Sequence, residues 1–197
     1  MAYGILYVPH ACARVAEMIP NASLALAHAD GSAAKKVFAA YPELVREVVY
    51  ATGKAIALKN SSAGSAAIMS AEQLLQMGTI ARQIAVLAIQ TQPSSAVPES
   101  LADHFVELGR TAGVLVQSLG TLCEPDGSPN QVISRESKFH KLRGNVLTSA
   151  TSAHWGYGVA AALQTMRLVG FYDRFADHCA ATAECLRLAR KENGFKN

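Results

Sequence analysis

Five short segments rich in Gly, Pro, Ser and Asn divide the chain into six longer stretches. They are ADGS at 29–32, KNSSAG at 59–64, TQPSSAVPES at 91–100, EPDGSPN at 124–130 and SAHWGYG at 152–158. The stretches between them are rich in Ala and Leu, which favour helices, whereas Gly and Pro favour turns. The spacing therefore predicts an all-α chain of six main helices. Pro42 lies inside the second one, where we expect it to kink the helix or to split off a short first piece.

The third break lies near the middle of the chain and contains Pro93 and Pro98. We expect it to join two tandem three-helix bundles, one within residues 1–92 and the other within residues 99–197. LLQMGTIARQIA, which starts at Leu74, aligns with YDRFADHCAATA, which starts at Tyr172, at an offset of 172 − 74 = 98 residues. Ala-rich helices align easily, but both segments fall in the third helix of their half. The alignment therefore predicts a tandem duplication.

Composition and charge exclude several classes of protein. Eighteen basic and fifteen acidic residues give a net charge of +3, with no Lys/Arg block to bind a nucleic acid. The four cysteines form no CxxC pair, which predicts reduced thiols in the cytoplasm. The segment IARQIAVLAIQ contains Arg82 and is too short to cross a bilayer, so we expect no transmembrane helix, and the pattern leaves a peripheral membrane partner open. The N-terminal MAYGILYVPHACA has no cationic region, so we expect no signal peptide.

Two carboxylates interrupt an apolar stripe on the last predicted helix. Leu163, Met166 and Gly170 recur at spacings of three and four residues, and the stripe continues through Asp173 and Asp177. This spacing indicates a single helix face, which we interpret as directed toward the core. Buried charges are costly unless they are paired or bound to a metal, so the two aspartates need partners.

The preceding helix shows the same interruption. Ile133 and Leu147 lie on a stripe whose intermediate positions are Glu136, His140 and Arg143. We expect Glu136, His140 and the two aspartates to form either a salt-bridged cluster or a metal site. Carboxylates and imidazoles on facing helices are how helical bundles bind metals, and this oxygen-rich set suits iron, manganese, zinc or magnesium.

A second interpretation of the same helices needs no metal. Arg143 and Arg174 could neutralise the aspartates directly. A different stripe on the last helix could then be the core face, leaving both aspartates in water: Leu168, Phe171, Phe175 and Cys179. The pattern alone leaves both interpretations open.

Sequence motifs of catalysis are missing from the chain. It contains no nucleophile elbow, no Gly-rich loop for phosphates and no zinc-protease helix. The Glu-x-x-His motif of di-iron carboxylate enzymes is also missing. We therefore expect a binding protein rather than an enzyme.

A stretch in the second half resembles the PhoU family. FYDRFADHCAATA at 171–183, preceded by HWGYGVAAALQTMRLVG, is similar to the last PhoU helix, whose hallmark reads aromatic or Leu, Glu or Asp, Arg, apolar, small, Asp, His. VPESLADHFVELGRTAGVLVQSL at 97–119 resembles the fourth helix, and AIALKN and ARVAEM extend the likeness less sharply toward the N-terminus. The pattern is most similar to that of actinobacterial PhoY-type homologues.

The resemblance implies two three-helix bundles, each presenting an acid-x-x-x-acid motif to a multinuclear iron or zinc cluster. Asp173 and Asp177 occupy the second motif, and Glu136 and His140 fall on the helix where relatives place acidic partners. In the first half the acids are replaced by Leu75 and Thr79. We therefore expect iron or zinc in the second half only.

The resemblance also implies a function. PhoU proteins are negative regulators of phosphate uptake that connect a phosphate ABC transporter to a membrane sensor histidine kinase. The expected partners are the transporter's ATPase subunit, the kinase and a second copy of the chain in a homodimer. The alternative is a metal-binding helical protein, for storage or sensing, outside the phosphate system.

Overall fold

The computed structural model describes residues 8–57, 62–124 and 127–192 and contains no strand within them. The six helices are α1 (Val8–His28), α2 (Gly31–Ile56), α3 (Ser62–Gln90), α4 (Glu99–Thr121), α5 (Pro129–Ala150) and α6 (Gly158–Glu192). The prediction of an all-α chain of six helices is confirmed. Residues 1–7, which begin the N-terminal segment considered for a signal peptide, lie outside the described residues, as do 58–61 in the second break.

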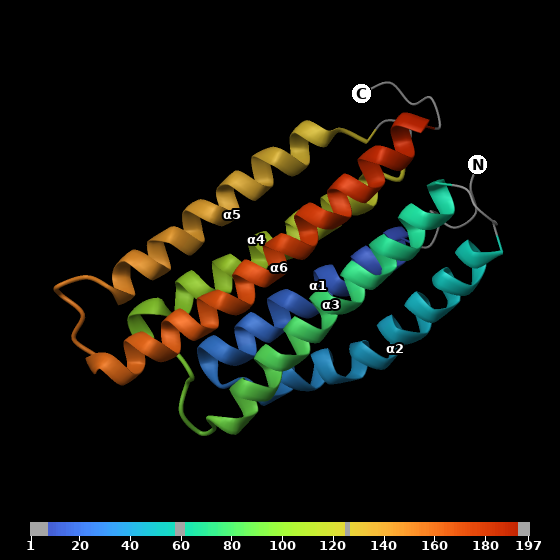
Figure 1. Ribbon diagram of the computed structural model, residues 1–197. Helices are drawn as coiled ribbons and strands as arrows, with labels where there is room; N and C mark the ends of the chain where they lie inside the picture. The colour runs from blue at the N-terminus through green and yellow to red at the C-terminus, as the bar shows by residue number, and fades with distance from the viewer. Residues whose placement is uncertain (1–7, 58–61, 125–126, 193–197) are drawn as a thin grey trace.

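The helices pack as two groups of three that lie side by side (Figure 1). α1, α2 and α3 contact one another in sequence order and across the group, and so do α4, α5 and α6. Two helix pairs join the groups, α1 with α4 and α3 with α6. α2 and α5 contact only helices of their own group and lie at opposite outer edges. No helix in the described part is long and apolar enough to cross a membrane.

Local sequence explains the first break and the continuity of α2. Ala29 adopts a left-handed φ of 52°, which ends α1. The carboxylate of Asp30 then accepts hydrogen bonds from the backbone N–H groups of Ser32 and Ala33, which are the free donors at the start of α2. Pro42 lies within α2, which is nevertheless one unbroken helix, so the expected split does not occur.

Glycines allow α1 and α4 to approach closely. A Cβ atom added to Gly109 would lie 2.0 Å from the Ser23 hydroxyl oxygen. One added to Gly113 would lie 2.8 Å from the Ala16 carbonyl oxygen and 2.9 Å from the Pro20 ring. Because neither glycine has a side chain, the α4 backbone packs directly on α1.

A buried hydrogen bond connects the first helix to the last. The Ser23 hydroxyl donates to the Ile19 carbonyl oxygen at 2.9 Å, so the Tyr172 hydroxyl donates to Ser23 at 2.6 Å. The Tyr172 ring packs against Phe105 with ring centroids 5.8 Å apart. Burial raises the pKa of Tyr172 well above its usual range, so its hydroxyl stays a donor at physiological pH. Residues of α1, α4 and α6 therefore meet at the centre of the molecule.

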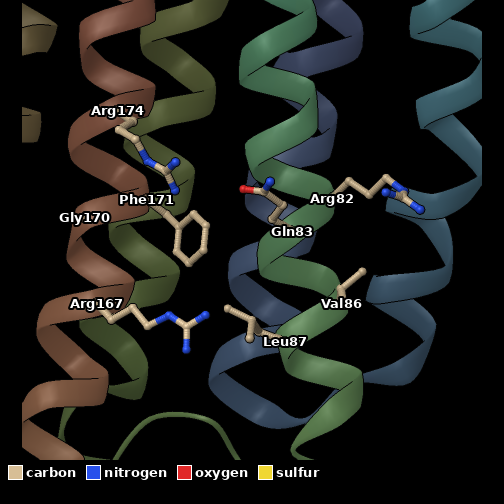
Figure 2. A pocket seen from close by; sticks show the side chains of 8 residues that line it. All are labelled: Arg82, Gln83, Val86, Leu87, Arg167, Gly170, Phe171 and Arg174. Atoms are coloured by element: carbon tan, nitrogen blue, oxygen red, sulfur yellow. The ribbon is translucent and has the colours of Figure 1, made fainter.

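α3 and α6 meet at their middle and diverge into a groove. A hydrogen bond of 2.6 Å joins Gln73 to His178, and the Cys179 thiol lies 3.4 Å from the Met77 sulfur. Toward the start of α6, the two helices leave a groove into which side chains of both project (Figure 2).

Candidate functional site

The core face of α6 is the second of the two stripes considered for it. Leu168, Phe171, Phe175 and Cys179 are all buried. Leu163 on the other stripe is 58% exposed, and Asp177 is exposed as well. The interpretation that the aspartates extend a core-directed stripe is wrong, because α6 packs on α3 and α4 through the neighbouring face.

The buried face of α5 also differs from the stripe predicted from the sequence. Its buried residues are Val132, Phe139, Val146 and Ala150. Ile133 is 59% exposed and Leu147 is 37% exposed, so the stripe that carries Glu136 and His140 faces outward. The polar residues predicted to form a site therefore lie on the surface of the second half, where water solvates them and removes the large cost of burial.

Three of the four predicted site residues take part in two separate ion pairs, neither of which includes Asp177. Asp173 forms an ion pair with Arg143, which joins α6 to α5. Glu136 and His140 lie 3.6 Å apart one turn from each other on α5. Arg174 lies over the Phe171 ring, 4.9 Å from its centroid, and pairs with neither aspartate. The salt-bridge interpretation therefore holds for Asp173 through Arg143.

The arrangement does not fit a metal ion. The described residues contain no group of three or more His, Cys, Asp or Glu side chains placed to hold one. The Asp173 carboxylate already contacts the Arg143 guanidinium, whose positive charge occupies the position that a metal ion would need. Iron or zinc at the four residues stays a prediction, which elemental analysis of the purified protein tests.

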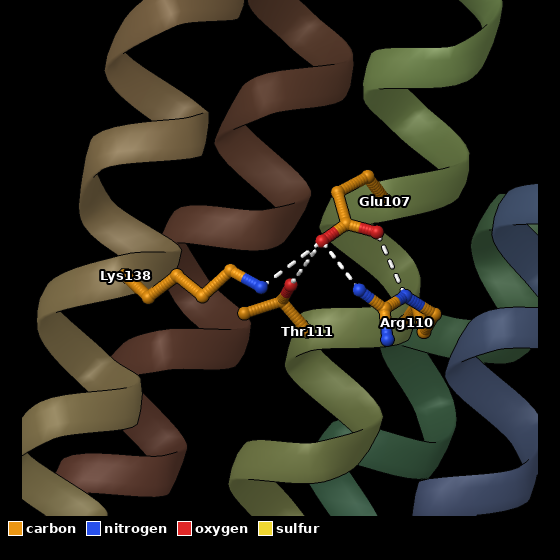
Figure 3. A network of polar contacts seen from close by, with 4 residues as sticks. All are labelled: Glu107, Arg110, Thr111 and Lys138. Carbon is orange, nitrogen blue, oxygen red and sulfur yellow. Dashed lines mark hydrogen bonds and ion pairs between the residues drawn. The ribbon is translucent and has the colours of Figure 1, made fainter.

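A network centred on Glu107 fixes α5 against α4 (Figure 3). Glu107 accepts two hydrogen bonds of 2.7 Å from Arg110 and one of 3.1 Å from Lys138 on α5. The hydrogen bonds from Arg110 lower the pKa of Glu107 to about 2, with a smaller contribution from Lys138. Arg135 adds a 2.9 Å hydrogen bond to the Val114 carbonyl oxygen. These contacts set the position of the outward stripe of α5.

Sequence reasoning missed the groove between α3 and α6. Its volume is about 600 Å³, and its lining includes no acidic residue. The lining residues are Arg82, Gln83, Val86, Leu87, Arg167, Gly170, Phe171 and Arg174. Arg167 and Arg174 lie on the helix face of Phe171, a spacing visible in the sequence. The sequence does not show that these arginines lie opposite Gln83, because that depends on how α6 packs against α3.

Comparison with known proteins identifies the family. The chain is 30% identical to "Phosphate-specific transport system accessory protein PhoU homolog 2" of Mycobacterium tuberculosis and of Mycobacterium bovis, over 87% of this chain and 85% of each relative. It is 28% identical to PhoU homolog 1 of Mycobacterium leprae, over 87% of this chain and 82% of the relative. No protein-family model matches the chain. The identity to these curated relatives extends across both three-helix groups, and the chain belongs to the PhoU family of phosphate-transport accessory proteins.

Proposed function

We propose that this protein is a cytoplasmic regulator of phosphate uptake and of phosphate-starvation signalling. The observation that carries the proposal is the 30% identity to a phosphate-specific transport accessory protein over 85% of that relative's length. The protein acts by binding the ATPase subunit of a phosphate ABC transporter and a sensor histidine kinase, and it catalyses no reaction. It works as a homodimer and reaches the membrane only through these partners.

The outer face of α5 and α6 is the surface we assign to the partners. We call it the α5–α6 face and define it by Ile133, Leu147 and Leu163, which are exposed apolar side chains. Glu136 and His140 lie among them. Apolar side chains surrounded by polar ones are typical of surfaces that bind other proteins. The Glu107 network holds α5 in place, so this face is a rigid target for a partner.

Deletion of the gene tests the regulatory role. We expect phosphate-starvation genes to be expressed in phosphate-rich medium, because the kinase loses the contact that keeps it inactive. Transcript measurements in the deletion strain and in a complemented strain check this, in a background without a second homologue. Normal repression in the deletion strain would remove the assignment to phosphate signalling.

Surface variants test the face itself. Ile133→Ser combined with Leu163→Ser should lower co-purification of the kinase or the ATPase subunit at least roughly tenfold, the effect of about 1.4 kcal/mol. Val49→Ser combined with Ile56→Ser is the matched control, since these α2 residues are 65% and 63% exposed. Equal recovery of partners by both variants would place the contact elsewhere on the molecule.

A further inference from the structure

The lining of the α3–α6 groove includes three arginines and no acidic residue. Arg167 and Arg174 extend from α6 toward α3, two turns apart, with the Phe171 ring between them (Figure 2). Seven residues separate the two arginines, which corresponds to about 10 Å along the helix. Neither guanidinium forms an ion pair with a carboxylate among the described residues, although five other arginines do.

The opposite wall of the groove adds a polar group and an apolar surface. Gln83 projects from α3 toward α6, and its amide offers both a donor and an acceptor. Val86 and Leu87 extend this wall by a further turn. The third arginine of the groove, Arg82, extends toward α2 and lies over the Tyr41 ring at 5.4 Å from its centroid. It adds to the positive potential without pointing into the groove.

The size and chemistry of the groove select the ligand class. Guanidinium groups bind phosphate oxygens through paired N–H donors, and two of them provide more donors than one carboxylate can accept. A volume of about 600 Å³ is that of a site for a small organic molecule, well beyond the size of one phosphate ion. Val86 and Leu87 supply an apolar wall for the remainder of the ligand. Phe171 is buried behind Arg174, which lies over its ring.

We propose that the α3–α6 groove is a nucleotide-binding site. The phosphates bind the guanidinium groups of Arg167 and Arg174, and the base lies against the apolar wall that Val86 and Leu87 form on α3. Gln83 contacts the base or the ribose. Because α3 belongs to the first half and α6 to the second, the ligand contacts both halves at once. This site is independent of the partners proposed above.

Isothermal titration calorimetry of the purified full chain tests the proposal. ATP, GTP, CTP and UTP are titrated separately in the presence of EDTA, so that no divalent cation neutralises their phosphates. We expect at least one to bind with a Kd below roughly 1 mM. The corresponding nucleoside and inorganic phosphate, titrated alone, should each bind at least roughly tenfold more weakly, since each contacts only part of the groove.

Three variants locate the binding. Arg167→Gln and Gly170→Leu should each weaken it at least roughly tenfold, the first by removing a charged donor and the second by filling the groove. A Cβ at Gly170 meets no atom within 4 Å, so Gly170→Leu should keep the fold, which circular dichroism verifies. Arg187→Gln, also on α6 but paired with Glu184, should leave the Kd unchanged.

Three outcomes would overturn the assignment. They are failure of all four nucleotides to bind, unchanged binding in Arg167→Gln and Gly170→Leu, and binding of inorganic phosphate as tight as that of the nucleotides. The last result would identify a bare oxyanion site. None of them bears on transcript levels in the deletion strain, so this proposal and the regulatory one fail separately.

Discussion

The guanidinium of Arg143 decides what the Asp173 carboxylate can bind. The ion pair between them joins α5 to α6 at the surface, where the Arg143 and Asp173 side chains are 32% and 40% exposed. Such an exposed pair contributes at most about 1 kcal/mol to stability. It nevertheless occupies an oxygen of Asp173 that a metal ion would need, and a cation beside it would be repelled by the guanidinium charge.

Metal content tests this consequence at the residue scale. Elemental analysis of protein purified without chelator should find well under one iron or zinc per chain. Arg143→Gln should raise zinc binding, because Asp173 and Asp177 then lie one turn apart without a competing cation. Asp173→Ala combined with Asp177→Ala is the control that should remove this gain. One metal per wild-type chain, lost in the double variant, would restore the four-residue site predicted from the sequence.

α1 and α4 pack so closely that one added methyl group should disturb them. Gly113→Ala places a Cβ 2.8 Å from the backbone oxygen of Ala16, so one helix must move. We expect destabilisation of about 1–3 kcal/mol from overpacking, despite the better helix propensity of Ala. Urea unfolding monitored by circular dichroism measures the change.

A second glycine provides the control for this prediction. Gly144 lies within α5, where an added Cβ meets no atom within 4 Å. Gly144→Ala should therefore stabilise the protein by up to about 1 kcal/mol through helix propensity alone. If both substitutions stabilise the protein, α1 and α4 are less closely packed than described.

The ends of the helices could be predicted from the sequence, and their orientation about their axes could not. Gly and Pro at the breaks act locally, as Asp30 does when it caps α2. On α6, however, Leu163 and Leu168 start two apolar stripes on neighbouring faces, and only the packing of α3 and α4 against one of them decides which is buried. The same packing of α6 places Arg167 and Arg174 in the groove and the two aspartates outside it.

Most buried apolar residues of the described part form one main core, to which all six helices contribute and in which α1 packs on α4 and α3 packs on α6. A small second cluster consists of Ala66, Cys185 and Ala189. The hydrogen bond between Ser23 and Tyr172 lies within the main core and joins positions 149 residues apart. The two halves therefore stabilise each other, although each has the three helices of a bundle.

Cooperative unfolding should follow from this core. Trp155 is the single tryptophan and lies in the second half, so its fluorescence reports on that half, whereas far-UV circular dichroism reports on all helices. We expect their urea transitions to coincide. Tyr172→Phe should lower the stability seen by both probes equally, by about 1 kcal/mol for the lost hydrogen bond. Separate midpoints for the two probes would show that the halves unfold independently.

The pairing of α1 with α4 also has a consequence for the newborn chain. A ribosome adds roughly 5–20 residues per second, starting from the N-terminus. The face of α1 that carries Ala16, Pro20 and Ser23 is synthesised well before Gly109 and Gly113, which cover it. Until α4 emerges, that face is open to chaperones or to a neighbouring nascent chain on the same messenger RNA. Translation speed between residues 29 and 121 therefore sets how long this face of α1 stays uncovered.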